Sequence, residues 1–569
     1  MPTLSNFKGS LVALFLPFLI CISLPLGIYL GNQEEIGSPL SYIAPYLGTV
    51  FLVMAAFFVV PLLLPSKKFK RVYLGVLVAL SLIVWVQSNF LFGDYGLFNG
   101  EALDINDRSV FAFMDAIVCL LLIYCAIRYD KLWILLGDLV VGIFILTLAM
   151  DCYAVLSFKR NSEWNAIYSS LSMEELDQAA FDEVTQFSSN GNIIHILLDE
   201  LQSDVFERVL SSDSTLAEAL DGFTYFPNTS GVYPYTEMSL PAILSGEIYK
   251  NDASKSEYLS RTINRNTFIT SLNEAGYKPM FHIHPAFCSH NFQLPCSRVP
   301  GISTGPAALN LIDLALFRSA PAMLKKPAYN GGMGLFKQYL SDLGHMTSQS
   351  GIGYLLLQQF NERFSVADIP PTYKFYQTMA THAPLVMESD CTPAKEHKPL
   401  EMRHMKVQAN CALQQVTRIL EQLKSAGIYD QTLIILSSDH GGNYLAPAQA
   451  KNLQRKGIPE KHFARAKSTL LIKPFNAHGE LQRSKNRASL ADIAATTLAQ
   501  IGSTAEFGED LFAQGFDRHR LREFYFIKWG FGGKKGERLE GFTPYTIKGD
   551  VRSAKAWHKK KAADEVSKN

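Results

Sequence analysis

The first 156 residues of this 569-residue chain contain five apolar runs, each long enough to cross a lipid bilayer. A helix needs about 20 predominantly apolar residues to span the hydrocarbon core. A buried helical core is the alternative interpretation, but the runs carry too few charges for helices with a solvated face. The sequence therefore predicts an α-helical transmembrane domain over residues 1–156, with helices at Leu11–Leu30, Tyr42–Leu64, Val72–Leu91, Val110–Ile127 and Leu132–Leu156.

The charges between these runs predict the orientation of the domain. Basic residues gather before the first run, between the second and third, and between the fourth and fifth, at Lys8, Lys67, Lys68, Lys70, Arg71, Arg128 and Lys131. Because short loops rich in lysine and arginine stay in the cytoplasm, the amino terminus is expected there, and everything after residue 156 is expected outside. No small-residue cleavage site closes the first run convincingly, so we interpret it as a retained anchor.

The remainder of the chain divides into three parts by composition. Residues 157–190 are polar and of mixed charge and are interpreted as a juxtamembrane linker, and residues 551–569 are interpreted as a basic tail. Between them, residues 191–550 alternate helical patterns with short apolar runs such as NIIHILL, YKFYQTMAT and TLIILSS. This alternation is typical of an α/β domain with a mainly parallel central sheet covered on both faces.

Four cysteines fall in the exported part of the chain, at Cys288, Cys296, Cys391 and Cys411. In an oxidising compartment they can pair in three ways, and pairing Cys288 with Cys296 and Cys391 with Cys411 closes the shortest loops. Free, buried thiols are the alternative. The net charge of +1 gives no indication of a nucleic-acid partner.

Polar side chains follow several strands of the predicted sheet. Asp199 and Glu200 follow IIHILL, Asp439 and His440 follow TLIILSS, and His382 follows KFYQTMAT. Ligand groups gather just beyond the carboxyl ends of strands in such sheets. Oxygen and nitrogen donors around an open position suit a divalent metal, and zinc and manganese fit this set equally well. We interpret Glu200 as a cap of the following helix rather than as a metal contact.

Thr236, in the run YPYTEMSLPAILSG, has two interpretations. Its hydroxyl is either the N-cap of a helix or a nucleophile. Coordination to a metal is a recognised way to activate a threonine hydroxyl, which is otherwise a poor nucleophile at neutral pH. If the loop carries Thr236 to the metal, a helix beginning near Ser239 would point its N–H groups at an anion bound beside it.

These residues resemble those of the alkaline phosphatase and sulfatase superfamily. Against the sulfatase signature C-x-P-S-R-x-x-x-L-T-G, the run TEMSLPAILSG keeps the length, the first serine, the later leucine and the final glycine. Thr236 stands where sulfatases modify a cysteine to formylglycine, and Met238, Leu240 and Ser245 replace the proline, arginine and threonine of the signature. Sulfate-ester hydrolysis by that route is therefore not expected.

The same run is similar to the T-x-x-S-[LV]-P element of membrane-anchored phosphoethanolamine transferases. The resemblance makes Thr236 the nucleophile and a metal ligand, and Ser239 a substrate contact. LLDELQSD resembles the first metal-ligand turn of these enzymes, at Asp199, and SSDHGG resembles their aspartate–histidine pair, at Asp439 and His440. Five spans followed by one exported sulfatase-like domain is also the layout of these transferases and of lipoteichoic-acid synthases.

Further elements resemble these transferases less closely. ATHAP resembles an element whose histidine, here His382, contacts the phosphoryl group or a second metal. The spacing of Cys391 and Cys411 resembles that of a paired-cysteine segment. The usual C-G-T-x-T element before the nucleophile and Y-x-H-G-x-P element after the D-H-G turn are absent, and Lys461 or His462 is expected to contact the phosphate instead.

The resemblance implies an enzyme of the bacterial inner membrane with its catalytic domain on the periplasmic side. The implied reaction transfers a phosphorylated alcohol, phosphoethanolamine or phosphoglycerol, from a membrane phospholipid to an envelope glycan or glycolipid through a phosphothreonine, with zinc or manganese as the metal. A phosphodiesterase or phosphatase with the same site is the first alternative. A non-catalytic sulfatase-like module, for assembly or binding, is the second.

Overall fold

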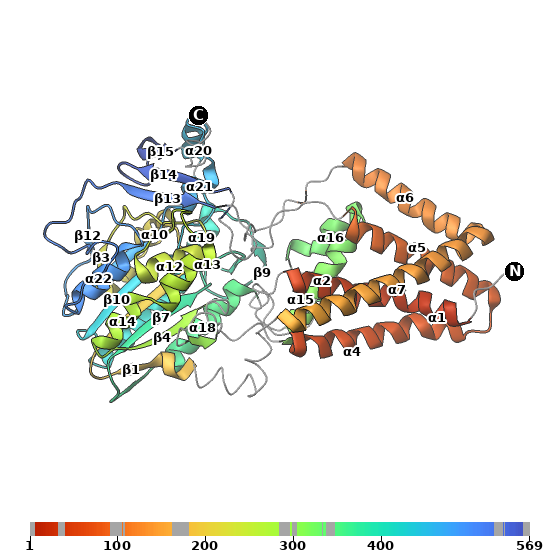
Figure 1. The fold of residues 1–569 in the computed structure, drawn as a ribbon, viewed down its shortest axis with the longest axis horizontal. Helices are drawn as coiled ribbons and strands as arrows, with labels where there is room; N and C mark the ends of the chain where they lie inside the picture. Colours follow the sequence, from red (N-terminus) through yellow and green to blue (C-terminus); the bar gives the residue numbers. More distant parts are fainter. Residues whose placement is uncertain are drawn as a thin grey trace. The chain divides into compact units, whose positions relative to one another are not determined.

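The computed structural model describes residues 6–31, 40–91, 105, 109–161, 181–283, 296–298, 304–332, 334–336, 348–445, 447–527, 539 and 541–560. The chain divides into two compact units (Figure 1). The helical unit comprises Met1–Ser172, Pro300–Thr347 and Lys395–His397, and the sheet unit comprises Met173–Val299, Ser348–Ala394 and Lys398–Asn569.

The helical unit contains five helices that are long and apolar enough to cross a membrane, counted over the described residues. Their spans agree with the five predicted from the sequence and are Phe7–Gly31, Ile43–Leu63, Lys67–Asn89, Val110–Arg128 and Leu132–Ser157. The corresponding elements are α1 (Asn6–Phe18), η1 (Leu19–Ser23), α2 (Leu24–Gly31), α4 (Leu40–Val59), η2 (Val60–Leu63), α5 (Lys67–Asn89), α6 (Ser109–Arg128) and α7 (Asp130–Asn161).

A segment from the middle of the chain completes the helical unit. Helix α15 (Thr304–Ser319) packs against α2 and α4, with Ala308, Leu311 and Ala315 in one apolar cluster with Leu24 and Ile43. Two short helices, η5 (Ala322–Leu324) and α16 (Lys325–Tyr329), follow it. The alanines allow the helices to approach closely, which is how helices associate when they share an apolar surrounding.

Polar contacts hold this segment to α5 and α6. The carboxylate of Asp115, buried on α6, accepts from Gln87 Nε2 at 2.6 Å and from the backbone N–H of Ala322 at 2.8 Å. The Arg318 guanidinium donates from Nε to the carbonyl of Ser88 at 3.0 Å. The sequence analysis placed residues 304–329 in the exported domain without separate comment, because their pattern alone does not name the helices that they pack against.

The sheet unit is built on an eight-stranded sheet in the order β12-β3-β11-β10-β2-β7-β4-β5. Its strands are β2 (Asn192–Leu198), β3 (Thr224–Tyr225), β4 (Lys278–Ile283), β5 (Cys296–Arg298), β7 (Thr372–Thr378), β10 (Thr432–Ser437), β11 (Leu470–Lys473) and β12 (Gln482–Arg483). The strands from β10 through β5 pair in parallel, and β11 is antiparallel to both of its neighbours. The predicted mainly parallel α/β fold is confirmed.

Helices cover both faces of this sheet. One group, which lies together in Figure 1, consists of α12 (Thr236–Ser245), α14 (Thr267–Glu274) and α22 (Asp492–Gln500). A second group is gathered around α19 (Met402–Ser425), which contacts α10 (Ser203–Leu210), α11 (Ser214–Ala219) and α18 (Gln349–Arg363). Alternate strand residues such as Ile193 and Leu197 pack on the first group, as the two-residue period of a strand requires.

Smaller elements complete the sheet unit. Its remaining helices are α13 (Lys255–Leu259), η3 (Ser260–Asn264), α20 (Pro447–Gln454) and α21 (Glu460–Arg465). Two-stranded sheets pair β1 (Gln186–Ser188) with β6 (Ser365–Ala367), and β8 (Leu385–Met387) with β9 (Pro393–Lys398). A three-stranded antiparallel sheet consists of β13 (Arg522–Phe526), β14 (Thr543–Ile547) and β15 (Trp557–Lys559). The short helix η8 (Ala554–Ala556) directly precedes β15.

The third strand of that sheet corrects the expected start of the tail at residue 551. Trp557 is 2% exposed, and its indole N–H donates to the carbonyl of Val551 at 2.9 Å. Its ring also packs against those of Phe463 and Phe524. The fold therefore continues to Lys560, because the buried tryptophan packs on the sheet although several of the residues around it are lysines.

Candidate active site

Two neighbouring strands of the central sheet bring two acids together. Asp199 follows β2 and Asp439 follows β10, and these strands pair in parallel with Leu197 opposite Ser437. The carboxyl ends of parallel strands meet at one edge of a sheet, so both carboxylates lie at that edge. Ligand atoms of Asp199, Asp439 and His440 lie within 4.8 Å of one another, and all three side chains are buried.

Thr236 joins this cluster from the first turn of α12. Its hydroxyl Oγ1 donates to Asp439 Oδ2 at 2.6 Å and lies 3.3 Å from Asp199 Oδ2. The N-cap of α12 is Tyr235, whose carbonyl accepts from the N–H of Ser239 at 3.0 Å. The helix thus begins at Thr236 rather than near Ser239, because Tyr235 is the last residue with extended backbone. The N-cap interpretation of Thr236 is wrong, and its hydroxyl faces the acids.

The electrostatics of the two carboxylates favour a bound cation. Burial raises the pKa of Asp199 to about 8, and the adjacent Asp439 acts in the same direction. Burial also raises the pKa of Asp439, although the hydrogen bond from Thr236 opposes the rise. Asp199 Oδ1 is buried and has no hydrogen-bond partner among the described residues. A divalent cation would offset the repulsion and occupy that free oxygen.

His440 supplies the nitrogen of the cluster. Its Nε2 lies 3.1 Å from Asp439 Oδ2, and its Nδ1 lies 3.2 Å from Nη1 of Arg465. Burial lowers the pKa of His440 to about 3, and the Arg465 charge adds to this, so the imidazole is neutral. A neutral imidazole is the form that coordinates metals. Three oxygen-bearing side chains and one imidazole therefore fit a divalent metal, and this donor set suits zinc and manganese alike.

His382, the other predicted catalytic residue, lies in the loop after β7. Its Nε2 is 3.5 Å from Glu200 Oε1. Burial alone would lower the pKa of His382, but the carboxylates of Glu200 and Asp199 raise it above its ordinary value. The imidazole therefore holds a proton more readily than a free histidine does, and it places positive charge beside the acids.

Glu200 and Arg465 form a buried ion pair that the sequence analysis missed. Glu200 Oε1 lies 2.5 Å from Arg465 Nη1, and the two side chains are 7% and 3% exposed. The cap assignment for Glu200 is wrong, since Gln202 is the N-cap of α10 and Glu200 adopts a left-handed backbone with φ 58°. Arg465 lies on α21, far from Glu200 in the chain, and no local sequence pattern identifies the two as partners.

The arginine ties the cluster to the loop that precedes Thr236. Arg465 Nη1 lies 3.3 Å from the carbonyl oxygen of Pro234, and Nε donates to Asn443 Oδ1 at 2.9 Å. Its guanidinium also lies over the ring of Tyr235, 5.6 Å from the centroid. Gln377 adds a hydrogen bond of 2.9 Å to Asp199 Oδ2. These contacts orient the carboxylates and the threonine without any ion present.

The predicted contacts of Ser239, Lys461 and His462 with the phosphate stay predictions, and the structure describes protein partners for Ser239 and His462. Ser239 is 1% exposed, and its hydroxyl donates to the carbonyl of Tyr233 at 3.2 Å, so it stabilises the loop before Thr236. His462 stacks on Phe526, with ring centroids 3.4 Å apart, and its Nδ1 lies 2.8 Å from the Tyr545 hydroxyl. Burial lowers the pKa of His462 to about 4, which makes it neutral. Lys461 lies in the first turn of α21.

One of the two predicted disulfides falls among the described residues. Cys391 and Cys411 are bonded and join the β8–β9 hairpin to α19. The predicted pair Cys288–Cys296 lies outside the described side chains.

Comparisons with known proteins agree with the fold. The sequence matches the family model for sulfatases over residues 191–503. No curated protein sequence matches. Similar solved structures include the lipoteichoic acid synthase LtaP from Listeria monocytogenes, at 12% identity over 70% of this chain and 94% of that chain, with a TM-score of 0.36.

Two further structures illustrate the range of these neighbours. The periplasmic domain of EptC from Escherichia coli has 13% identity over 59% of this chain and 89% of that chain, with a TM-score of 0.35. A phosphonate monoester hydrolase from Silicibacter pomeroyi has 15% identity over 63% of this chain and 85% of that chain, with a TM-score of 0.37.

Proposed function

The chain belongs to the sulfatase family, and from this premise we propose that it is a metal-dependent transferase with Thr236 as nucleophile. It would move phosphoethanolamine or phosphoglycerol from a membrane phospholipid to an envelope glycan or glycolipid. The observation that carries the proposal is the position of Thr236 Oγ1, 2.6 Å from Asp439 and 3.3 Å from Asp199. A threonine so placed suits the formation of a phosphothreonine.

The first half-reaction exchanges one P–O bond for another. Thr236 Oγ1 bonds to the phosphorus of the lipid, the bond from phosphorus to the diacylglycerol oxygen breaks, and diacylglycerol leaves with a proton. Asp439 Oδ2 accepts the hydroxyl proton of Thr236 in a hydrogen bond and orients the attacking oxygen. A divalent metal held by Asp199, Thr236, Asp439 and His440 would lower the pKa of the hydroxyl and polarise the phosphoryl group.

Positive side chains stabilise the charge on the phosphoryl oxygens. The raised pKa of His382 keeps its imidazole protonated over a wider range, so it can donate a hydrogen bond to those oxygens. Arg465 acts through its partners, since it holds Glu200 and His440 in place. Positioning and electrostatic stabilisation are the main contributions of a protein to phosphoryl transfer.

In the second half-reaction, a sugar hydroxyl of the acceptor attacks the phosphothreonine and releases Thr236. The five apolar helices support a lipid donor, because an anchored site stays within reach of a molecule that cannot leave the bilayer. The bond between Cys391 and Cys411 supports an oxidising compartment for the catalytic part. We therefore place the protein in a bacterial inner membrane with its sheet unit on the periplasmic side.

The test is the mass of the protein after reaction with phospholipid. Full-length protein in detergent is incubated with phosphatidylethanolamine or phosphatidylglycerol without acceptor, and intact-mass analysis follows. We expect an adduct of the transferred head group at Thr236 together with diacylglycerol, and no adduct in Thr236→Ala. Wild-type protein without an adduct from either lipid would contradict the proposal.

A hydrolase is the second candidate, favoured by the partial exposure of Thr236, which would let water reach the phosphothreonine. Incubation of the loaded protein with envelope glycan separates the two. A glycan adduct supports transfer, and free head-group phosphate without a glycan adduct supports hydrolysis. A non-catalytic module predicts neither product and no stoichiometric metal.

A further inference from the structure

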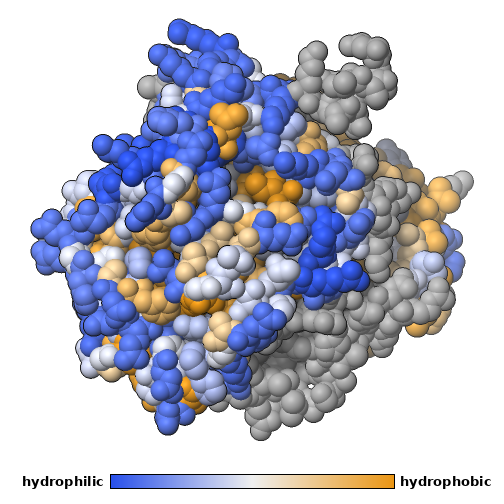
Figure 2. All heavy atoms as spheres, turned by 60° about the vertical axis from the view of Figure 1, so that its left-hand side comes forward, coloured by the Kyte–Doolittle hydropathy of each residue, from blue (hydrophilic) through white to orange (hydrophobic). Residues whose placement is uncertain are grey.

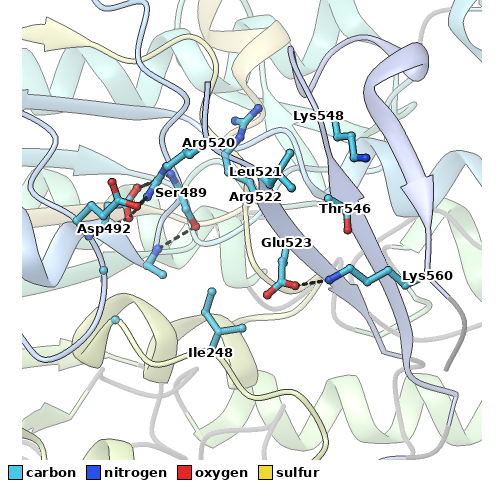
Figure 3. Close-up of a pocket in the computed structure, with 14 residues that line it drawn as sticks. Ile248, Ser489, Asp492, Arg520, Leu521, Arg522, Glu523, Thr546, Lys548 and Lys560 are labelled. Atoms are coloured by element: carbon cyan, nitrogen blue, oxygen red, sulfur yellow. Dashed lines mark hydrogen bonds and ion pairs between the residues drawn. The ribbon is translucent and has the colours of Figure 1, made fainter. Parts of the chain in front are cut away.

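A second concave site lies in the sheet unit at the end of α12 remote from Thr236. It is a cavity of about 470 Å³ that begins at Gly246, the residue that caps α12, and extends to β13 and β14 (Figure 3). Its volume falls within the range of about 300–1,000 Å³ that is typical of ligand sites. All of its lining residues belong to the sheet unit.

Two groups of ion pairs form the walls of this cavity. Arg520 contacts both Asp492 and Glu509 on one side. Glu523 contacts Lys560 at 2.5 Å on another side (Figure 3). These two groups hold three acids and two cations, and a ligand would meet walls rich in hydrogen-bond donors and acceptors.

Two further cations in the lining form no ion pair with a carboxylate among the described residues, although Asp550 and Asp492 lie near enough to Arg522 to oppose the lowering of its pKa. Arg522 is 2% exposed; its terminal nitrogens donate to the carbonyls of Asn228, Ala488 and Gly549 and to Asn228 Oδ1, while its Nε–H has no partner. Burial lowers the pKa of Arg522 to about 9, and nearby Arg520 acts in the same direction. Lys548 is exposed at the cavity and makes no ion pair in the described part of the chain.

The terminal nitrogens of Arg522 are satisfied by protein oxygens, and its Nε–H is a buried donor without a partner, which is costly to leave unmade. The lining holds four cations, Arg520, Arg522, Lys548 and Lys560, and three acids, Asp492, Glu509 and Glu523, so its excess of one positive charge favours an anionic ligand. The Ser489 and Thr546 side chains in the lining, together with the paired acids, add partners for hydroxyl groups. Leu521, 57% exposed, and Ile248 add apolar area of the kind that packs against the C–H face of a sugar.

The distance from this cavity to the nucleophile suits an extended acceptor. Helix α12 has 10 residues, so it separates Gly246 from Thr236 by about 15 Å at about 1.5 Å per residue. Strand β13 gives a similar measure, since it runs from Arg522 at the cavity to Phe526, whose ring lies 6.4 Å from that of Tyr235. An oligosaccharide could place one sugar in the cavity and another at Thr236.

We propose that this cavity binds an acidic sugar unit, bearing a carboxylate or a phosphate, of the glycan acceptor. The proposal rests on the proposed function in one respect only, namely that the ligand is part of the acceptor. Binding itself requires Arg522 and Lys548 and does not require Thr236.

The test compares acidic and neutral sugars on full-length protein in detergent by titration calorimetry. The probes are glucuronate, glucose 6-phosphate and glucose, and the variants are Lys548→Glu and, as a matched control, Lys451→Glu, an exposed lysine of α20 outside the cavity. Both acidic sugars should bind more tightly than glucose. Lys548→Glu should weaken their binding by about tenfold or more, as expected for loss of a charge-assisted contact, and Lys451→Glu should leave it unchanged.

Asp439→Asn separates this cavity from the metal cluster, which also attracts anions. Binding that persists in Asp439→Asn and falls in Lys548→Glu supports the cavity. Absence of binding by either acidic sugar, or binding that is lost in Asp439→Asn and kept in Lys548→Glu, overturns the proposal.

Kinetics distinguish failure of this inference from failure of the proposed function. If the function holds, Lys548→Glu should raise the KM for an acidic acceptor and leave the rate of adduct formation at Thr236 unchanged. Transfer without Lys548-dependent binding retains the function and rejects the subsite. Lys548-dependent binding in a protein that never forms the adduct retains the subsite and rejects its role as an acceptor site.

Discussion

The helical unit exposes many of its large apolar side chains, whereas the sheet unit buries nearly all of those that the structure describes. In the helical unit Phe57 and Leu120 are 70% and 66% exposed, whereas the described exposed large apolar residues of the sheet unit are only Val366, Phe507 and Leu521. The face in Figure 2 is accordingly dominated by hydrophilic side chains, with scattered apolar ones. The contrast shows that each unit is built for a different solvent, lipid for one and water for the other.

The buried polar groups of the two units differ in the same way. In the helical unit, the Asp115 carboxylate accepts hydrogen bonds from Gln87 and from the backbone N–H of Ala322, so it links α6 to α5 and to η5. Such polar contacts matter in lipid, because the hydrophobic effect does not drive helices together there. In the sheet unit, the buried Asp199, Asp439 and His440 bring ligand atoms within 4.8 Å of one another. Buried polar groups thus join helices in the first unit, and in the second three of them form one possible metal site.

The largest expected effect is on chemistry in the sheet unit. Thr236→Ala should lower the rate of head-group transfer by about 10⁴-fold or more, because the nucleophile is lost. Its melting temperature should stay close to that of the wild type, since the hydrogen-bond partners described for the hydroxyl are Asp439 and Asp199. Thr236→Ser is the control that retains a hydroxyl and part of the activity. Unchanged transfer in Thr236→Ala would move the reaction away from this cluster.

Removal of the buried arginine should destabilise the sheet unit. Arg465→Met leaves the carboxylate of Glu200 buried without its partner, which costs about 3–5 kcal/mol for a pair of this kind. The double variant Arg465→Met/Glu200→Gln should recover part of this loss, since no uncompensated charge remains. Denaturant unfolding followed by tryptophan fluorescence measures both. Equal stability of the single and double variants would show that the charge of Glu200 is not the cause.

Loss of the disulfide should lower the stability of the sheet unit slightly less than loss of the buried arginine. Cys391→Ser/Cys411→Ser opens a bridge between residues 20 apart in the chain, and loss of such a cross-link costs about 3 kcal/mol. Addition of reductant should lower the stability of the wild type by a similar amount and leave the double variant unchanged. A reductant effect that persists in the double variant would come from another pair of cysteines.

Loss of the hydrogen bonds of Asp115 should lower the stability of the helical unit by a smaller amount. Asp115→Leu leaves the amide of Gln87 and the N–H of Ala322 without their acceptor, at a cost of about 1–3 kcal/mol. Asp115→Asn, which keeps one carbonyl acceptor, should lose less. Protease susceptibility of the 304–329 segment in detergent and in lipid reports the change. A stable Asp115→Leu would mean that the apolar cluster of α15 alone holds the segment.

The smallest effect concerns pH. Burial lowers the pKa of Lys374 on β7 to about 7, and Lys278 adds to the shift. Because this pKa is lower than in the unfolded chain, the unfolded state binds more protons above pH 7, and stability should rise with pH, by about 1 kcal/mol between pH 7 and pH 8. Lys374→Met should lack this rise. The comparison of the two proteins removes the opposite contribution of Asp199, whose raised pKa makes stability fall as pH approaches 8.

Local sequence patterns predicted much of the fold and of the site. The five apolar runs, the alternation of strands and helices, and the acids at the ends of β2 and β10 are all properties of short segments. Hydrophobic period and run length determine these features because they depend on burial within one element. The convergence of Asp199 and Asp439 followed from a general rule about parallel strands.

The remaining features depend on residues that are distant in the chain. Glu200 looked like a helix cap because nothing near it in the sequence names Arg465 as its partner. The burial of Trp557 is not visible in the local sequence because two of the rings that pack on it, Phe463 and Phe524, come from α21 and β13.

The amino-acid sequence by itself determined which segments suit lipid, which form the sheet, and which acids lie at the carboxyl ends of its strands. Only the tertiary structure decided that residues 304–329 join the apolar helices, that Arg465 supports the acids, and that a second cationic cavity lies beyond α12. The reason is physical: periodicity records whether a residue is buried, whereas the identity of its partner depends on how the whole chain packs.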